Sequence, residues 1–240
     1  MEPEAWTTRA VNLPEHARNA IHTDAGAHAA GFPRALVAGV TTYAYLTHPI
    51  VAAWGIDWVR SGGGEVRFRH PVFEDDLLRC EPAIADDAVT VRGLVGDGEA
   101  RASLRAVRVG GPPPEAPAGE RAITRTVQLS GEWSDYGVRA GDDLALYHDE
   151  GIVHPAVWPA LANQVVHAEV ASGAWIHTRS VVRHHGVAAS SSVAMVTATV
   201  VDRFASRSGQ RAVLDVRIEV DGVLVASLEH EAIVRLPPLP

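Results

Sequence analysis

The chain has 240 residues, 47% of them hydrophobic, and a formal net charge of −8. This length suits one large domain or two small ones, and the negative charge argues against a nucleic-acid partner. The single cysteine, Cys80, excludes an intrachain disulfide, which is typical of a reducing compartment. The acidic start lacks the apolar segment of a signal peptide, and no apolar run reaches the roughly 18 residues that span a bilayer. We therefore expect a cytoplasmic protein without a membrane segment.

The first predicted elements are a polar cluster and a long apolar helix. Residues 19–30 are mostly small and polar, which favours a short helix or helical turns that end near Pro33. Residues 37–54 are apolar on nearly every helical face, so protein must surround this helix. Pro49 would kink the helix or start a second one, and Gly55 would end it.

A strand-rich region follows at residues 58–109. Residues 65–69 alternate polar and apolar side chains. Further strands are predicted at 77–84, 89–95 and 100–109, separated by acidic and glycine-containing turns. A buried helix followed by antiparallel strands is an α+β pattern.

Residues 110–120 are rich in proline and glycine, and they mark a boundary. This composition disfavours a core element and suits a semi-extended linker. It divides the chain into an N-terminal unit, residues 1–109, and a C-terminal unit, residues 121–240.

The second unit repeats the first. Its apolar helix opens at His154, and strands follow from Trp175 onward. Residues 98–104 and 222–228 agree in four of seven positions near the end of each unit. Such internal similarity predicts two copies of one helix-plus-sheet unit.

Three motifs of the first unit resemble the MaoC-like hotdog-fold hydratases and dehydratases. They are Asn-Ala-Ile-His at 19–22, Gly-Phe at 31–32 and Leu-Val-Ala-Gly-Val at 36–40, with the strand 66–72 after them. In that family an antiparallel sheet wraps a long helix, and two such units pair with continuous sheets. The resemblance thus implies a double hotdog: an α+β fold with two long central helices, each wrapped by an antiparallel sheet, related by a pseudo-twofold axis.

Carried over position by position, the resemblance implies that His22 is the catalytic histidine and that Asn19 is the asparagine of the motif. The position of the family's catalytic aspartate holds Ala17, so the acid must come from elsewhere. Asp24, two residues after His22, is our first candidate, and Glu15 is the second.

The second unit keeps a different part of the signature. Gly-Asp is present at 141–142, but Tyr147 stands where the histidine belongs, and His154 occupies the helix-start position. Asp142 is a third candidate acid if the two sites face one another. Tyr147 and His154 are grouped with it as substrate-binding candidates.

The start of the first helix supplies a place for a substrate oxygen. Free amides at Gly39 and Val40, at the positive end of the helix dipole, would bind a thioester oxygen as its charge develops. A histidine titrates near neutrality and can act as the base, which is the role expected of His22.

The resemblance implies a hydro-lyase that acts on an enoyl or 3-hydroxyacyl thioester. Coenzyme A or an acyl carrier protein with its phosphopantetheine would carry the substrate, and no other cofactor and no metal is expected. Three alternatives stay open: an acyl-thioester hydrolase, a non-catalytic acyl-ligand binding protein, and a biosynthetic isomerase or cyclase. A homodimer or higher oligomer also stays open.

Overall fold

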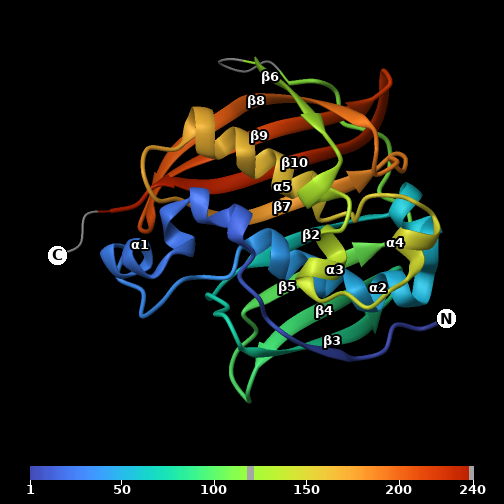
Figure 1. Ribbon diagram of the computed structural model, residues 1–240, viewed down its shortest axis with the longest axis horizontal. Helices are drawn as coiled ribbons and strands as arrows, with labels where there is room; N and C mark the ends of the chain where they lie inside the picture. The colour runs from blue at the N-terminus through green and yellow to red at the C-terminus, as the bar shows by residue number, and fades with distance from the viewer. Residues whose placement is uncertain (118–121, 238–240) are drawn as a thin grey trace.

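The computed structural model describes residues 1–117 and 122–237, and its main element is a ten-stranded sheet (Figure 1). The strand order is β1-β3-β4-β5-β2-β7-β10-β9-β8-β6, and neighbouring strands are antiparallel. The strands are β1 (Trp6–Arg9), β2 (Gly63–Phe68), β3 (Leu77–Ala85), β4 (Ala88–Val95), β5 (Ala102–Val107), β6 (Ala122–Gln128), β7 (Ile176–His184), β8 (Val193–Ser206), β9 (Gly209–Val220) and β10 (Val223–Arg235).

Helices pack on one face of this sheet (Figure 1). The α-helices are α1 (Asp24–Ala29), α2 (Gly39–Ser61), α3 (Tyr136–Ala140), α4 (Leu146–Asp149) and α5 (Val157–Val165). Short 3-10 turns are η1 (Pro14–Arg18), η2 (Ala20–His22) and η3 (Gly131–Trp133), and a π-helical turn, η4 (Val166–Val170), continues α5.

The two ends of the sheet have the same internal order. Read from one edge, the strands run 1-3-4-5-2, and read from the other edge they run 6-8-9-10-7. The halves meet where β2 pairs with β7, from Gly63 opposite Arg183 to Arg67 opposite Arg179. The predicted pair of sheet-wrapped helices with pseudo-twofold symmetry is therefore confirmed. The linker predicted at 110–120 lies between β5 and β6, and its residues 118–120 fall outside the described residues.

Helix α2 forms the centre of the first half. All residues from Val40 to Val51 are buried, as expected for a helix that is apolar on every face. Pro49 lies inside the helix. Gly55 adopts a positive φ of 64° and interrupts the helix instead of ending it, since helical residues continue to Ser61.

The central helix of the second half is shorter than predicted. Instead of running from His154 to about residue 171, α5 contains nine residues and then widens into the π turn η4. The residues before it are held differently, because the Nδ1 atom of His154 accepts the N–H of Ala156 at 3.0 Å. A side chain that binds its own backbone in this way competes with the helix and delays its start.

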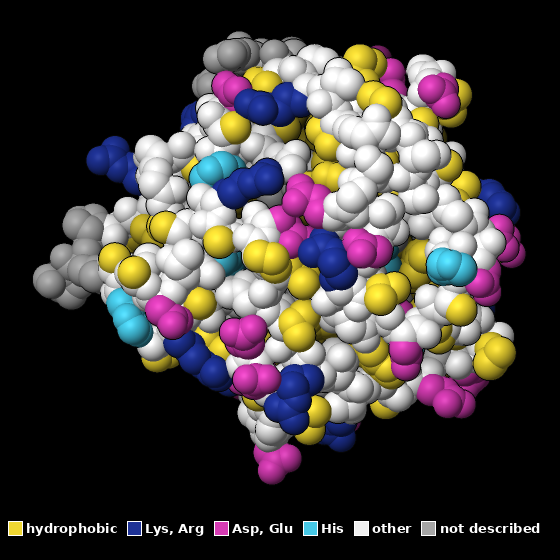
Figure 2. All heavy atoms as spheres, in the orientation of Figure 1, with side chains coloured by type: hydrophobic (Ala, Val, Ile, Leu, Met, Phe, Trp, Pro, Cys, Tyr) yellow, Lys and Arg dark blue, Asp and Glu magenta, His cyan; other side chains and the backbone are white. Residues whose placement is uncertain are grey.

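The surface carries charges of both signs. On the face shown in Figure 2, arginine and acidic side chains are interspersed, without a large basic patch. Within the described residues, the helices lack the combination of length and apolar character that crossing a membrane requires.

Candidate functional site

A cavity of about 270 Å³ opens beside the start of α2. Its wall combines residues of both halves: His22, Gly39 and Phe68 come from the first, and Asn163 and His177 from the second. A smaller cavity of about 190 Å³ is also lined by His22 and Asn163. His22 therefore stands where the two halves of the chain meet around empty space.

His22 is held in one tautomer by its backbone surroundings. Its Nδ1 atom lies 2.8 Å from the carbonyl oxygen of Leu36, and because a carbonyl can only accept, Nδ1 donates. In the neutral ring Nε2 then keeps its lone pair. Burial lowers the pKa of His22 to about 4, although the hydrogen bond to Leu36 opposes this shift. At neutral pH His22 is an uncharged imidazole with Nε2 left to accept a proton.

Gly39 shares the larger cavity with His22, as the sequence predicted. It is the first residue of α2, so its amide has no acceptor within the helix, and the same holds for Val40. A methyl group at Gly39 would lie 3.4 Å from the ring of Phe68 and 3.4 Å from Nδ1 of His177. Glycine thus keeps this position open. The side chain of Val40 is buried in the core, and only its backbone can serve the site.

Asn19 and Asp24 have structural partners. The side-chain amide of Asn19 donates to the carbonyl of Trp175 at 2.9 Å, and its Oδ1 caps η2 by accepting the N–H of Ile21 at 3.4 Å. Asn19 lines the smaller cavity, but backbone groups occupy both ends of its amide. Asp24 is exposed at the start of α1, and its Oδ1 accepts the N–H of Ala35 at 2.8 Å. Asp24 lines neither cavity, because side chains two residues apart on a turn point in different directions.

Glu15 lines the smaller cavity, but its carboxylate is hydrogen-bonded to an arginine. Both of its carboxylate oxygens bind Arg139 of α3, at 3.0 and 2.5 Å. Burial, the largest single influence, raises the pKa of Glu15, but the hydrogen bonds and charge of Arg139, together with a backbone hydrogen bond and His16, lower it below its usual value. An ionised, doubly hydrogen-bonded carboxylate is a poor proton donor, so Glu15 does not fill the place of the missing acid.

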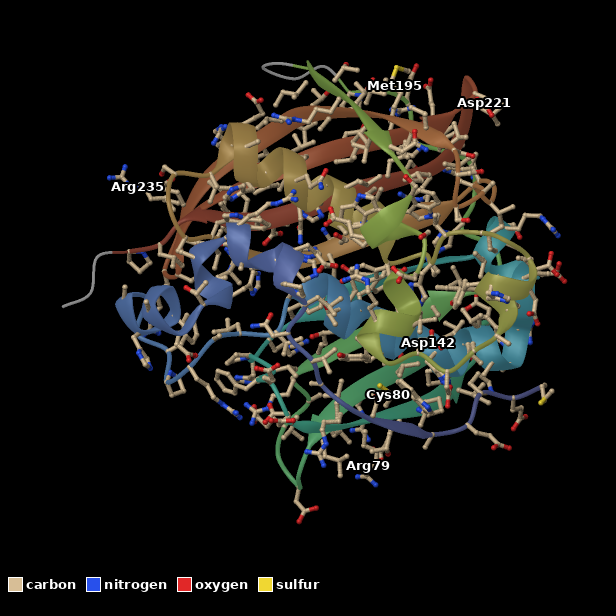
Figure 3. The ribbon with its side chains drawn as sticks, in the orientation of Figure 1. Arg79, Cys80, Asp142, Met195, Asp221 and Arg235 are labelled. Carbon is tan, nitrogen blue, oxygen red and sulfur yellow. The ribbon has the colours of Figure 1, made fainter. Side chains whose placement is uncertain are left out.

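The second-half candidates come together, but away from His22. Oδ2 of Asp142 lies 3.1 Å from Nε2 of His154, and the rings of Tyr147 and His154 are 4.5 Å apart. All three are buried, and none lines either cavity that holds His22. Figure 3 shows Asp142 in front of the sheet, beside α3. The second copy of the signature is a packed cluster and not an open site.

Asp142 also belongs to a second group of residues, whose spacing would suit a cation. His48, Asp142 and Asp143 each place a ligand atom within 4.8 Å of the others. His48 Nε2 already lies 2.6 Å from a carboxylate oxygen of Asp143, so a hydrogen bond between the two side chains accounts for the arrangement.

Three polar residues of the site were not predicted. Asn163 lines both cavities, and its Oδ1 is buried without a partner. His177 lines the larger cavity, and its Nδ1 is likewise buried without a partner. His16 lies beside His22, with ring centroids 5.9 Å apart, and binds the hydroxyl of Tyr136 at 3.0 Å. Neither the sequence around Asn163 nor that around His177 contained a signal, because pairing between β2 and β7 brings the two halves together at this cavity.

Comparison with known proteins identifies the fold. No protein-family model and no curated protein matches the sequence, but solved structures match the whole architecture. RV0216, a conserved hypothetical protein from Mycobacterium tuberculosis with a double hotdog fold, is 12% identical with a TM-score of 0.65, over 96% of each chain. The chain is a double hotdog.

Two further structures that match the whole chain are named as dehydratases. A protein from Chloroflexus aurantiacus J-10-fl, assigned to the MaoC domain dehydratases, is 12% identical with a TM-score of 0.65, over 98% of this chain and 96% of that one. The dehydratase domain of PpsC from Mycobacterium tuberculosis, solved with C12:1-CoA, is 13% identical with a TM-score of 0.55, over 96% and 93%. Two proteins that carry the name thioesterase, from Lactobacillus plantarum and Novosphingobium aromaticivorans, also match the architecture. At these identities the likeness establishes the double hotdog fold predicted from the sequence.

Proposed function

We propose that this double hotdog is a hydro-lyase that adds water to an enoyl thioester or removes it from a 3-hydroxyacyl thioester. The observation that supports it best is the cavity in which the free Nε2 of His22 and the first turn of α2 at Gly39 lie together. The first can take a proton, and the second can bind the oxygen that becomes negative when the proton leaves. The complex of the PpsC dehydratase domain with C12:1-CoA supports an acyl thioester as ligand.

In this proposal the imidazole of His22 acts without a carboxylate partner. In the dehydration direction, Nε2 removes the α-proton and the electrons move onto the thioester oxygen, which the amides at Gly39 and Val40 stabilise. The enolate then reforms its carbonyl, the bond from the β-carbon to its hydroxyl breaks, and that oxygen takes the proton from the imidazolium to leave as water. The ring ends neutral, so the proton from the first step serves the second.

The lining of the cavities supports a single-imidazole scheme. Among the described residues, the wall of the larger cavity contains no aspartate or glutamate. The two glutamates of the smaller cavity both face arginines: Glu15 binds Arg139, and Glu132 lies 3.8 Å from Arg18. A thioester hydrolase of this fold would use an aspartate or glutamate on a central helix. Among the described residues, no carboxylate of α2 or α5 lines either cavity, which argues against this reaction.

The test is turnover of short and long enoyl-CoA thioesters, followed by the loss of the enoyl absorbance. Replacement H22A is expected to abolish hydration, because a loss of the base typically costs about 10²–10⁴-fold. H28A is the matched control, since His28 is exposed on α1 and binds only the Pro33 carbonyl. Hydration that survives H22A contradicts the assignment. Release of free thiol by the wild-type protein would identify a thioester hydrolase instead.

A further inference from the structure

A second histidine, His177 at the beginning of β7, faces the same cavity from the other half of the chain. It is 5% exposed, and its Nδ1 atom is buried without a hydrogen-bond partner. A methyl group on Gly39 would lie 3.4 Å from this nitrogen, so Nδ1 faces the first turn of α2. Buried polar atoms are normally satisfied, and an unsatisfied one at a cavity wall indicates a ligand atom that binds there.

The other side of the ring is anchored. Nε2 of His177 lies 2.8 Å from Oγ of Ser180, which in turn lies 2.9 Å from Nδ1 of His230. The rings of His177 and His230 pack with centroids 4.2 Å apart, and Phe68 packs on His177 at 4.7 Å. These contacts fix the orientation of the ring.

Ser180 links His177 and His230, and its hydroxyl allows two arrangements of the ring protons. Burial, and secondarily the neighbouring His230, lowers the pKa of His177 well below its usual range, although a hydrogen bond to the backbone of Arg179 opposes the shift. Burial lowers the pKa of His230 to about 3. Both rings are therefore neutral and carry one proton each. Ser180 has one hydroxyl proton, so it donates to one ring and accepts from the other.

The two arrangements differ in where they leave an unpaired N–H. If Ser180 donates to His230, the buried Nε2 of His230 carries a proton that has no acceptor, because this residue is 0% exposed and Nε2 has no partner. If Ser180 donates to His177, the unpaired N–H is Nδ1–H of His177, at the cavity wall. Orphaned N–H groups in the core are rarer than orphaned acceptors, which favours the second arrangement.

We propose that Nδ1–H of His177 is a hydrogen-bond donor to the thioester oxygen, beside the amides of Gly39 and Val40, and that Ser180 and His230 hold it in this tautomer. The proposal rests on the proposed function, because it assigns the oxygen of an acyl thioester as the acceptor. His177 is then a catalytic residue from the second half, while Ser180 and His230 are positioning residues. No proton is transferred from the ring, which stays a neutral donor.

Activity tests should separate the two sides of the ring. The variant H177N places an amide N–H near the position of Nδ1, whereas H177Q places one near Nε2. We expect H177Q to lower kcat about 100-fold with little change in KM, as for loss of one oxyanion donor. H177N should retain activity within about 10-fold of wild type. Equal losses in both variants, tracking their thermal stability, would show a structural role and overturn the proposal.

A second measurement is independent of turnover. Long-range ¹H–¹⁵N NMR correlations assign the tautomer of His177, and titration with ¹³C-carbonyl butyryl-CoA, a saturated thioester that cannot be hydrated, reports the hydrogen bond. We expect the Nδ1–H tautomer, and a shift of the carbonyl resonance that H177N keeps and H177Q loses. The Nε2–H tautomer, or a carbonyl shift that is the same in both variants, would overturn the proposal. If the protein binds butyryl-CoA in this way but hydrates no enoyl thioester, the proposed reaction fails and the donor assignment stands.

Discussion

The variant G39A, at the start of α2, is expected to lower activity without lowering stability. Gly39 has an ordinary helical backbone, so alanine meets no conformational strain there. The added methyl would lie 3.4 Å from three atoms, on Phe68 and His177, which is close packing without a severe clash. Alanine is favoured over glycine inside a helix by up to about 1 kcal/mol, so we expect G39A to unfold at an equal or slightly higher urea concentration.

The same methyl group occupies the space through which a thioester oxygen approaches the free amides. Lengthening or misaligning one oxyanion hydrogen bond removes part of the roughly 3–4 kcal/mol that such a donor contributes. We expect kcat for enoyl-CoA hydration to fall by about 10-fold to 100-fold. G186A is the control, because a methyl at Gly186 meets only Val225, at 3.6 Å or more, and Gly186 lines neither cavity. A stable G39A variant with wild-type kcat would refute the placement of the substrate oxygen at this helix start.

Three further predictions follow from buried titratable groups. Because burial holds the pKa of His22 near 4, kcat/KM should stay flat from about pH 8 to pH 5; a fall centred near the usual histidine pKa would contradict the assigned base. His184 is fully buried with both ring nitrogens unpartnered and a pKa lowered to about 3. Neutral in the folded state, it contributes stability that is complete above the unfolded pKa and is lost as pH falls toward the folded one. H184F should therefore gain about 2 kcal/mol over wild type in urea unfolding at about pH 5 relative to pH 8, and an equal difference at both values would show that protonation is not involved. R139M leaves the carboxylate of Glu15, whose side chain is 5% exposed, without its partner, and should cost about 3 kcal/mol; a double variant R139M/E15Q that recovers most of this loss confirms the reason, and no recovery contradicts it.

The sequence predicted the parts of this structure that depend on neighbouring residues. The long apolar helix could be found because its signal is contiguous, and the duplication because similar residues recur at similar spacing. His22 and Gly39 were singled out by the resemblance to the motifs of the MaoC-like family. Asp24 failed as a candidate because closeness in sequence says little about direction. Its carboxylate turns toward the backbone of Ala35.

The rest of the site depends on pairing between distant strands. His177 reaches the first-half cavity because β7 pairs with β2. The sequence of residues 176–184 does not indicate that β2 is the neighbouring strand. The packed state of Asp142, Tyr147 and His154 was equally hidden, since a Gly-Asp pair looks the same whether its carboxylate faces a cavity or a buried histidine. The length of α5 was misjudged because the apolar pattern begins before the helix and runs on into the π turn η4, so the pattern does not mark where the α-helix starts or ends.

Joining both copies in one polypeptide removes a constraint that identical subunits obey. In a homodimer each substitution appears in both sites, so neither site can change alone. Here the cavity beside His22 is lined by His177 and Asn163 of the second half. The corresponding signature residues of the second half are buried in the core. Covalent linkage at 110–120 thus allows one copy to become a dedicated wall for the other, and neither half, expressed by itself, contains a whole site.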